Sequence, residues 1–287
     1  MKPGFLRFPG GCVVEGNNLD NRYQWKKSVG SVEEREWNWN RWAVHGNDKD
    51  KGFSSPYSHY NQSLGIGYYE YFLLCEYLGA SPLPVVNVGI ACQFMSNELI
   101  QINDEKFQEF INDALDLIEF ANGSVDTKWG KVRKQMGHPE PFNVKMIGVG
   151  NEQWETEQVD FFKRYEAFEK AIHEKYKDIK LIGSAGPDIN SKKYTSAWDF
   201  YYKNQDKENF VDAVDEHYYV KPEWLCENVH FYDKYPRNIK IFAGEYAAHN
   251  EAKSNNWESA LTEAAFMTGL ERNADVIQLA SAAPLFA

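Results

Sequence analysis

Six short runs of mostly apolar residues recur along the chain, and each predicts a β-strand. The runs are FLRF (5–8), PLPVVNVG (82–89), VKMIGVG (144–150), IKLIGSAG (179–186), FVDAVDEHY (210–218) and IKIFAGEY (239–246). Because polar residues hardly interrupt them, they are typical of parallel strands that are buried on both faces. The pattern therefore predicts a parallel sheet.

Longer segments between these runs have the three-to-four-residue periodicity of amphipathic helices. Such segments cover residues 104–122 and 157–177, and a third begins after Asn256, an expected N-cap, and extends to Leu270. The ends of the last four strands are spaced by about 30 residues, the period of a βα unit. This alternation predicts either a doubly wound α/β sheet or a (β/α)8 barrel.

Both folds place their chemistry at the C-terminal ends of the strands, so the position of candidate residues does not distinguish them. The absence of a nucleotide-binding motif favours the barrel. A nucleotide-binding doubly wound fold carries a glycine-rich loop between a strand and a helix, but GIGYYE (65–70) follows no predicted strand. We therefore predict an α/β fold, a (β/α)8 TIM barrel, that fills residues 1–287 as one catalytic domain. Only six strands are countable, so the first and eighth strands are expected to be absent.

Composition and charge exclude several classes of partner. Hydrophobic residues make up 43% of the 287 residues, which is enough for a large buried core. The formal net charge of -11 argues against nucleic acid and anionic membranes, since both bind basic surfaces. The sequence shows no apolar run of roughly 20 residues, as a membrane span needs, and no recognisable signal peptide. The compartment, cytoplasmic or secreted, stays open.

The four cysteines are far apart in the sequence, and none forms a CxxC pair. They are Cys12, Cys75, Cys92 and Cys226. We therefore expect free thiols, and neither a metal nor a cofactor is predicted.

Two of the predicted strands end in a carboxylate that follows a glycine or an asparagine. Glu152 comes after VKMIGVG and Asn151, and Glu245 lies in FAGEY. Paired carboxylates at a barrel mouth are the equipment of glycoside hydrolysis, in which one donates a proton and the other attacks the sugar or activates water. The alternative is a solvated charge or a structural ion pair at the rim. The pattern alone does not choose between these interpretations.

Three further side chains are candidates for the same end of the sheet. Arg7, on the first run, could keep a carboxylate ionised or bind sugar hydroxyls, although an ion pair within the barrel would explain it equally well. His217 and Tyr219 close another strand, where a histidine could bind hydroxyls and a tyrosine hydroxyl could orient a carboxylate. A metal at His217 is not predicted, since no second His or Cys lies at ligand spacing.

Tryptophans cluster in a polar segment near the N-terminus, at Trp25, Trp37, Trp39 and Trp42. They could stack on the faces of sugar rings, or they could be packing anchors of a long loop.

Several long motifs together resemble one enzyme family. These are LRFPGGCVVEG (6–16), RYQWKKSVG (22–30), GYYEYFLLCEYLGASPLPVVNVGIACQ (67–93), MGHPEPFNVKMIGVGNEQW (136–154) and IFAGEYAAH (241–249). They are similar to glycoside hydrolase family 51, the α-L-arabinofuranosidases, over almost the whole chain. The resemblance implies a retaining glycosidase that acts on arabinose-containing plant polysaccharides or oligosaccharides.

The resemblance also implies roles for individual residues. Glu152 matches the general acid/base of the family and Glu245 its nucleophile. Asn151 matches the residue that binds the sugar 2-hydroxyl, and Arg7 the pocket arginine near the nucleophile. Tyr219, or less favourably Tyr218, matches the tyrosine that orients the nucleophile.

Trp154 and Tyr246 stand next to the two acids in the motifs and are expected to form walls of the sugar pocket.

Two departures from the family pattern matter as well. Cys12 stands where members often carry an asparagine, which puts one sugar contact in doubt. The first barrel strand of the family, with another substrate-binding glutamate, should precede Met1, and the eighth strand and a β-sandwich should follow Ala287.

Two rival hypotheses remain beside the arabinofuranosidase. The first is another retaining pentosidase or glucanase of the same clan, because two acids do not specify the sugar. The second is an inactive or carbohydrate-binding barrel fragment, whose exposed strand edges could pair into a homo-oligomer. A retaining mechanism predicts that the two carboxyl groups lie about 5–5.5 Å apart.

Overall fold

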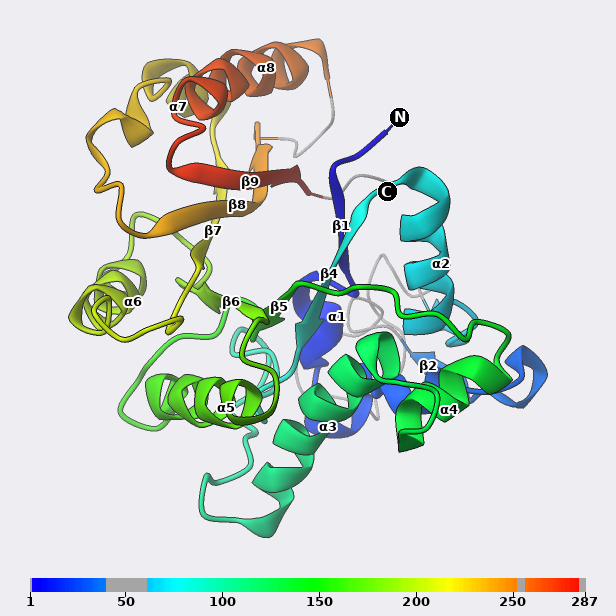
Figure 1. The fold of residues 1–287 in the computed structure, drawn as a ribbon. Coiled ribbons are helices and arrows are strands. Elements are labelled where there is room, and N and C mark those ends of the chain that lie inside the picture. Colours follow the sequence, from blue (N-terminus) through cyan, green and yellow to red (C-terminus); the bar gives the residue numbers. More distant parts are fainter. Residues whose placement is uncertain (1, 40–60, 252–255, 284–287) are drawn as a thin grey trace. The chain divides into compact units, whose positions relative to one another are not determined.

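A computed structural model describes residues 2–39, 61–251 and 256–283 of the chain. The chain divides into two compact units, each of which is described by itself (Figure 1). The N-terminal unit consists of residues 1–153 and 159–180, and the C-terminal unit consists of residues 154–158 and 181–287.

The N-terminal unit contains three parallel strands that pair in the order of the chain. They are β1 (Phe5–Phe8), β4 (Ser81–Val86) and β5 (Met146–Val149). Two further short strands, β2 (Asn38–Trp39) and β3 (Asn61–Gln62), form an antiparallel pair. The α-helices are α1 (Gly11–Glu15), α2 (Tyr68–Leu78), α3 (Glu105–Asn122), α4 (Lys128–Gln135) and α5 (Phe161–Lys175). Short 3-10 helices are η1 (Leu19–Asn21), η2 (Trp25–Ser28) and η3 (Val32–Glu34).

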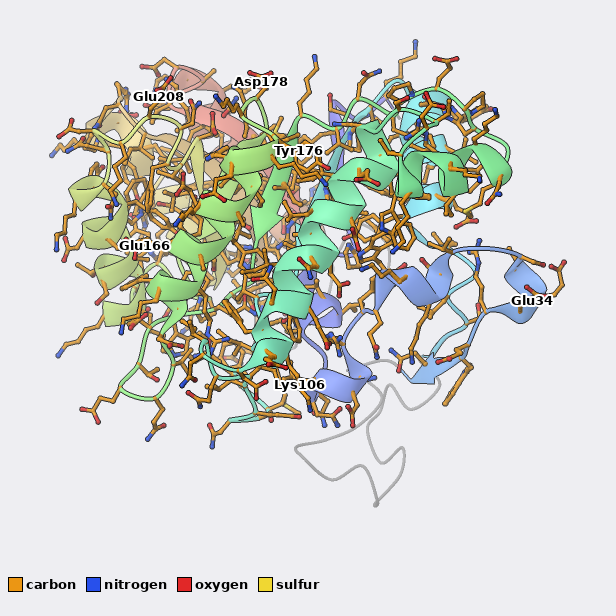
Figure 2. All side chains as sticks on the ribbon, turned by 60° about the horizontal axis from the view of Figure 1, so that its bottom comes forward. Glu34, Lys106, Glu166, Tyr176, Asp178 and Glu208 are labelled. Carbon is orange, nitrogen blue, oxygen red and sulfur yellow. The ribbon has the colours of Figure 1, made fainter. Side chains whose placement is uncertain are left out.

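Helix α2 packs against β1 and β4, and α3 packs against both α4 and α5 (Figure 1). Figure 2 shows Lys106 near the start of α3 and Tyr176 directly after α5. The hydroxyl of Tyr176 donates a hydrogen bond to the carbonyl oxygen of Leu115 on α3, over 3.4 Å. The apolar faces predicted for these helices are thus buried against each other and the sheet.

The C-terminal unit contains four parallel strands, again paired in the order of the chain. They are β6 (Lys180–Ser184), β7 (Ala213–Val220), β8 (Lys240–Ala248) and β9 (Ile277–Ala282). The helices are α6 (Lys192–Lys203), α7 (Pro222–Glu227) and α8 (Trp257–Arg272), with a 3-10 turn η6 (Phe231–Lys234). Helices α7 and α8 pack together, and α8 lies against β8 (Figure 1).

Side-chain caps fix where several helices begin. Asp104 caps α3, Thr127 caps α4, Ser191 caps α6 and Asn256 caps α8, each by accepting a backbone N–H of the first turn. Such caps satisfy donors that have no partner inside the helix. The predicted N-cap at Asn256 is confirmed.

In both units, parallel strands alternate with helices in chain order, which is the pattern of an incomplete (β/α)8 barrel, and the described residues contain seven such strands. All six predicted strands are present. The count of six was wrong, however, because β9 follows the strand that carries Glu245. The expected absence of an eighth strand is therefore corrected. Helix α5 also begins at Phe161, four residues after the predicted start at residue 157. The single catalytic domain stays a prediction.

One tryptophan of the N-terminal cluster is a packing residue. Trp25 is buried, and the centroid of its ring lies 4.9 Å from that of Trp129 on helix α4. Trp37 is exposed. Trp42 lies outside the described residues. Sugar stacking by Trp25 is therefore ruled out by its burial.

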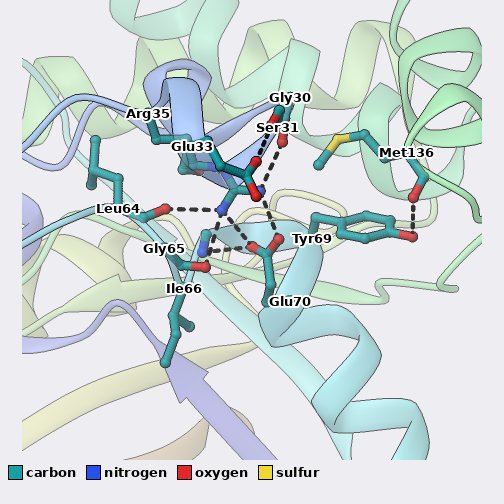
Figure 3. Close-up of polar contacts among 12 residues, drawn as sticks. Gly30, Ser31, Glu33, Arg35, Leu64, Gly65, Ile66, Tyr69, Glu70 and Met136 are labelled. Carbon is teal, nitrogen blue, oxygen red and sulfur yellow. Dashed lines mark hydrogen bonds and ion pairs between the residues drawn. The ribbon is translucent and has the colours of Figure 1, made fainter.

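An ion pair fastens Arg35, directly after η3, to the start of α2 (Figure 3). Arg35 is bidentate to the carboxylate of Glu70, at 2.7 and 3.0 Å, and also donates to the carbonyl oxygens of Gly30, Leu64 and Gly65. Glu70 in turn accepts the backbone N–H of Gly67 at the helix start. The pair thus joins Arg35 and the start of α2, which are far apart in the sequence. No described helix is both long enough and apolar enough to span a bilayer.

Candidate active site

Glu152 follows strand β5 on a backbone that few residues adopt. The strand ends at Val149, and Gly150 then turns the chain with a φ of 84°. A Cβ on Gly150 would lie 2.5 Å from Gln153 Oε1, so only glycine fits there. Glu152 itself has a φ of 46°. For a residue other than glycine this conformation costs about 1–3 kcal/mol, and such strain clusters at functional sites.

A buried carboxyl group, Glu15 at the end of α1, holds the amides on both sides of Glu152. Asn151 Nδ2 donates to one oxygen of Glu15 over 3.0 Å, and Gln153 Nε2 donates to the other over 2.9 Å. Gln153 Oε1 accepts the backbone N–H of Asn151. Burial raises the pKa of Glu15 well above its usual value. This network fixes the turn that presents Glu152.

Arg7 on β1 adds a second constraint on the same turn. Its Nη2 donates to Asn151 Oδ1. Since Glu15 takes the Nδ2 end of that amide and Arg7 takes the Oδ1 end, the orientation of Asn151 is fixed. Arg7 and Asn151, singled out in the sequence, are therefore direct neighbours in the structure.

Cys12 lies beside the Glu152 carboxylate. Its Sγ donates to Glu152 Oε2 over 3.9 Å, from the first turn of α1. Both side chains are largely buried, with 5% of Cys12 and 7% of Glu152 exposed. The residue at which the sequence departs from its family pattern thus directly contacts the candidate acid/base.

Glu245 is presented in a different way, by a β-bulge in strand β8. Glu216 pairs with Ala243, but the next residue of β7, His217, pairs with Glu245. Gly244 is therefore an extra residue of β8, and the pairing of β8 with β9 is irregular over the same stretch. Because side chains alternate between faces, one extra residue moves Glu245 onto the face that carries His217.

Alternate residues of β7 line that face beside Glu245. Tyr219 Oη donates to Glu245 Oε2 over 2.7 Å, and His217 Nδ1 lies 3.6 Å from the same oxygen. The other ring nitrogen of His217 lies 3.2 Å from the carboxylate of Asp215. Gly244 makes room for Asp215, since a Cβ on it would lie 1.9 Å from Asp215 Oδ1. A hydroxyl and an imidazole thus both face one carboxylate oxygen.

The opposite face of β7 and β8 packs against the helices. Tyr218 stacks on Tyr246 with ring centroids 5.8 Å apart, and both rings contact Phe266 of α8. Tyr246 is buried there, 3% exposed. This placement argues against the expectation that Tyr246 forms a wall of the sugar pocket. It also removes Tyr218 as the tyrosine that orients Glu245.

A second buried carboxyl group, Glu216, lies on this same helix-facing side. It accepts hydrogen bonds from Trp198 Nε1 at 2.9 Å, Tyr194 Oη at 3.0 Å and Tyr232 Oη at 2.7 Å. Burial raises its pKa to about 7, although these hydrogen bonds act in the opposite direction. Glu216 therefore fastens the back of β7 to α6 and η6.

Trp154 belongs to the C-terminal unit and is 9% exposed. The ammonium group of Lys193 on α6 lies 3.6 Å from the centroid of its ring, a cation–π contact. The position of Trp154 is thus fixed by α6, and part of its ring is already covered.

Comparisons with known proteins identify the family. A profile described as "Alpha-L-arabinofuranosidase 1 domain" matches residues 1–237, and one described as "Alpha-L-arabinofuranosidase C-terminal domain" matches residues 224–287. The chain belongs to the α-L-arabinofuranosidases of glycoside hydrolase family 51. The resemblance predicted from the sequence motifs is confirmed.

Relatives within the family are similar over the whole chain. An extracellular exo-α-L-arabinofuranosidase of Streptomyces chartreusis is 44% identical over 299 residues, which cover 100% of this chain and 33% of the relative. α-L-Arabinofuranosidase 2 of Arabidopsis thaliana is 38% identical, covering 100% of this chain and 37% of the relative. The chain therefore spans about a third of the length of these curated relatives.

Solved structures confirm the barrel fold. An arabinose-bound MgGH51 α-L-arabinofuranosidase matches with a TM-score of 0.79 and 28% identity, over 99% of this chain and 42% of that one. An α-L-arabinofuranosidase of Thermotoga maritima, also solved with arabinose, has a TM-score of 0.69 at 18% identity and covers 99% of this chain and 55% of its own. The second likeness concerns the fold alone.

Three buried residues that belong to the site or support it were missed in the sequence. Asp215 was detectable, because it precedes His217 and Tyr219 at the two-residue spacing of one strand face. Glu15 gave no such signal, since its partners Asn151 and Gln153 lie far along the chain. Glu216 looked like part of a charged strand end, although it is fully buried.

Proposed function

We propose that this chain carries the catalytic centre of a retaining α-L-arabinofuranosidase. The enzyme would hydrolyse terminal non-reducing arabinofuranosyl residues of arabinose-containing plant polysaccharides or oligosaccharides. The observation that supports this most strongly is the arrangement around Glu245 in a chain of this family. A carboxylate at a bulged strand end, with a tyrosine hydroxyl at 2.7 Å, is built like an oriented nucleophile.

In this proposal, Glu245 attacks the anomeric carbon. The Tyr219 hydroxyl donates to Oε2 and so holds the carboxylate in place for the attack. His217 contributes a second polar contact near Oε2, and its own orientation depends on Asp215. Holding the carboxylate in one rotamer lowers the entropy cost of reaching the geometry for attack.

Glu152 donates a proton to the leaving oxygen and then takes one from water, as the general acid/base. Asn151, fixed between Glu15 and Arg7, offers its amide to the sugar 2-hydroxyl. Contacts at that hydroxyl strengthen in the transition state of such reactions. Arg7 in the N-terminal unit and Trp154 in the C-terminal unit are the further expected sugar contacts, whereas the burial of Tyr246 against Phe266 argues against such a role for it.

Two aryl α-L-arabinofuranosides with leaving groups of different acidity test the roles separately. The Glu152→Ala variant should lose about 10²–10⁴-fold on the poor leaving group, which needs protonation, and much less on the good one. The Glu245→Ala variant should lose activity on both. Glu208→Ala is a matched control, because Glu208 is exposed in the C-terminal unit (Figure 2). NMR of the first sugar product should show retained anomeric configuration.

Other outcomes would redirect the assignment. Cleavage of aryl β-xylosides without cleavage of arabinofuranosides would favour another retaining pentosidase or glucanase. A wild-type chain as inactive as both variants would mean that the chain, about a third of the length of its relatives, is an inactive or carbohydrate-binding fragment. A crystal structure with the two carboxyl groups near 9 Å apart would favour inversion, since retention needs about 5–5.5 Å.

A further inference from the structure

Two cysteines and a carboxylate meet in the interior of the N-terminal unit, next to the proposed acid/base. Sγ of Cys12, Sγ of Cys92 and a carboxylate oxygen of Glu15 all lie within 4.8 Å of one another. All three side chains are buried, with exposures of 5%, 0% and 1%. The wide spacing of the cysteines in the sequence concealed this cluster, which we call the thiol–carboxyl cluster.

The backbone around the thiol–carboxyl cluster is fastened independently of the three side chains. The N–H of Cys92 donates to Gly16 O over 3.0 Å, and the N–H of Gly16 donates to Cys12 O over 2.9 Å. Asn87 Nδ2 donates to Val14 O over 3.0 Å and so ties the loop after β4 to α1. The donor atoms are therefore brought together by the fold, which lowers the cost of gathering them around a ligand.

We propose that Cys12, Cys92 and Glu15 form a binding site for one soft divalent cation, such as Zn²⁺ or Cd²⁺. Two sulfurs and one carboxylate oxygen are a donor set that such ions prefer, whereas Mg²⁺ and Ca²⁺ prefer oxygen ligands. Tetrahedral zinc with bonds of about 2.0–2.3 Å needs its ligand atoms roughly 3.3–3.8 Å apart. The observed spacing requires only a small contraction.

Binding would replace protons by the cation. The hydrogen bond with Cys92 and burial raise the pKa of Cys12, and burial raises the pKa of Glu15, so without a cation the buried site favours the protonated forms of these two groups. Coordination as two thiolates and a carboxylate releases these protons to the solvent, and the cation then compensates the buried negative charge. No oxidant or reductant takes part.

The position of the site gives it a consequence for catalysis, which rests on the proposed function. Glu152 Oε2 lies 3.9 Å from Cys12 Sγ, so a bound cation attracts the carboxylate that must exchange protons with substrate. Coordination also draws Glu15 away from the amides of Asn151 and Gln153. We therefore expect the soft cation to act as an inhibitor.

Equilibrium dialysis of the whole chain against Zn²⁺ alone or Cd²⁺ alone tests the site without relying on activity. Cys226→Ser serves as the background, because Cys226 is exposed and would bind metal by itself. We expect one ion per chain and a cadmium–thiolate absorption band. Cys92→Ser should weaken binding by about 100-fold, at least the effect of losing an outer-shell partner. Cys75→Ser, which removes a buried thiol of α2, should not weaken it.

Several results would overturn the proposal. They are no stoichiometric binding, binding that survives Cys92→Ser, or an equal loss in Cys75→Ser. If Cys92→Ser does not fold by circular dichroism, Glu15→Gln and Cys12→Ser provide the same comparison. Where the chain is active, a chelator should reverse the inhibition, whereas reversal by a thiol reductant alone would indicate cysteine oxidation. An inactive chain that still binds one ion would contradict only the proposed function.

Discussion

The two candidate catalytic carboxylates are presented by different devices, although a glycine precedes each of them. Glu152 lies in a turn after β5, where Gly150 and Glu152 both have positive φ values and buried amides fix the backbone. Glu245 lies within a strand, where the extra residue Gly244 shifts the pairing and side chains of β7 hold the carboxylate. One carboxylate is positioned by backbone conformation and the other by strand register.

Each device also has a buried glutamate behind it. Glu15 accepts hydrogen bonds from the side-chain amides on both sides of Glu152. Glu216 accepts hydrogen bonds from a tryptophan indole and from tyrosine hydroxyls on the helix-facing side of β7. Proteins rarely bury carboxyl groups without such partners, because desolvation is costly. The comparison shows that the supports of a site can be more deeply buried than the groups that perform the chemistry.

The largest effect that we expect concerns the support behind β7. The pKa of Glu216 in the folded chain, about 7, lies above its unfolded value near 4.5. The folded state therefore binds more protons between these values, and the free energy of unfolding should fall as pH rises through this window, by about 3 kcal/mol. Denaturant unfolding at several pH values should show a flatter profile for Glu216→Gln than for wild type.

Glu208→Gln is the control for this experiment, since Glu208 is exposed. It should reproduce the wild-type dependence on pH. An identical slope for Glu216→Gln and wild type would show that Glu216 does not exchange its proton in this range.

A substitution at Gly244 tests how strand register positions Glu245. In Gly244→Ala, the new Cβ would meet the Asp215 carboxylate and displace it from His217. A displacement of about 1 Å near the reacting groups can cost 10²-fold, so kcat on an aryl arabinofuranoside should fall by about 100-fold. Gly4→Ala measures the general cost of adding a methyl group, because no atom lies near its Cβ position and its φ is not positive. Unchanged kcat in Gly244→Ala would separate Asp215 from catalysis.

Gly150→Ala is the matching change in the turn that positions Glu152. The backbone there has positive φ, and the new Cβ would press on Gln153, which holds the Asn151 N–H. We expect a loss of about 30-fold in kcat, since about 1–3 kcal/mol of strain can be relieved by moving Glu152. The loss should be smaller with an activated leaving group, which does not need the acid. Equal losses on both leaving groups would contradict this division of roles.

The smallest effect should come from the Tyr219 hydroxyl. Tyr219→Phe removes one hydrogen bond from Glu245 Oε2 while the ring, 36% exposed, keeps its place. A hydrogen bond to a charged group contributes about 1.5–3 kcal/mol, and water can partly replace it here, so kcat should fall by about 10-fold. Tyr218→Phe changes the neighbouring residue on the other face and should leave kcat unaltered. If Tyr219→Phe and Tyr218→Phe lowered kcat equally, the face of β7 that carries a tyrosine would not determine its effect on catalysis.

Most of the strand framework could be predicted, because parallel strands buried on both faces have continuous apolar runs. Strand β9 could not, because Gln278 and Ser281 interrupt its sequence and half of its residues are exposed. Helix α5 begins later than its apolar stripe suggested, after the polar residue Asp160. These errors follow from local patterns that tertiary packing overrides.

The site was predictable where its residues share a strand and hidden where they do not. Asn151 and Glu152, or His217 and Tyr219, are neighbours in sequence and in space. Tyr246 was expected beside Glu245 because it adjoins it in sequence, but consecutive residues of a strand point to opposite faces, and its ring stacks on Tyr218 under α8. Glu15 and Cys92 enter through contacts between distant segments, for which a single sequence has no signal.

The bulge at Gly244 makes the length of β8 as important as its composition. A side-chain pattern with a period of two has only two phases, and one residue exchanges them. If the bulge straightened and Gly244 paired with His217, Glu245 would turn into the aromatic layer under α8 and Tyr246 would turn toward His217. Between Ala243 and Glu245 the bulge therefore decides whether the carboxylate lies beside His217 or points into the core.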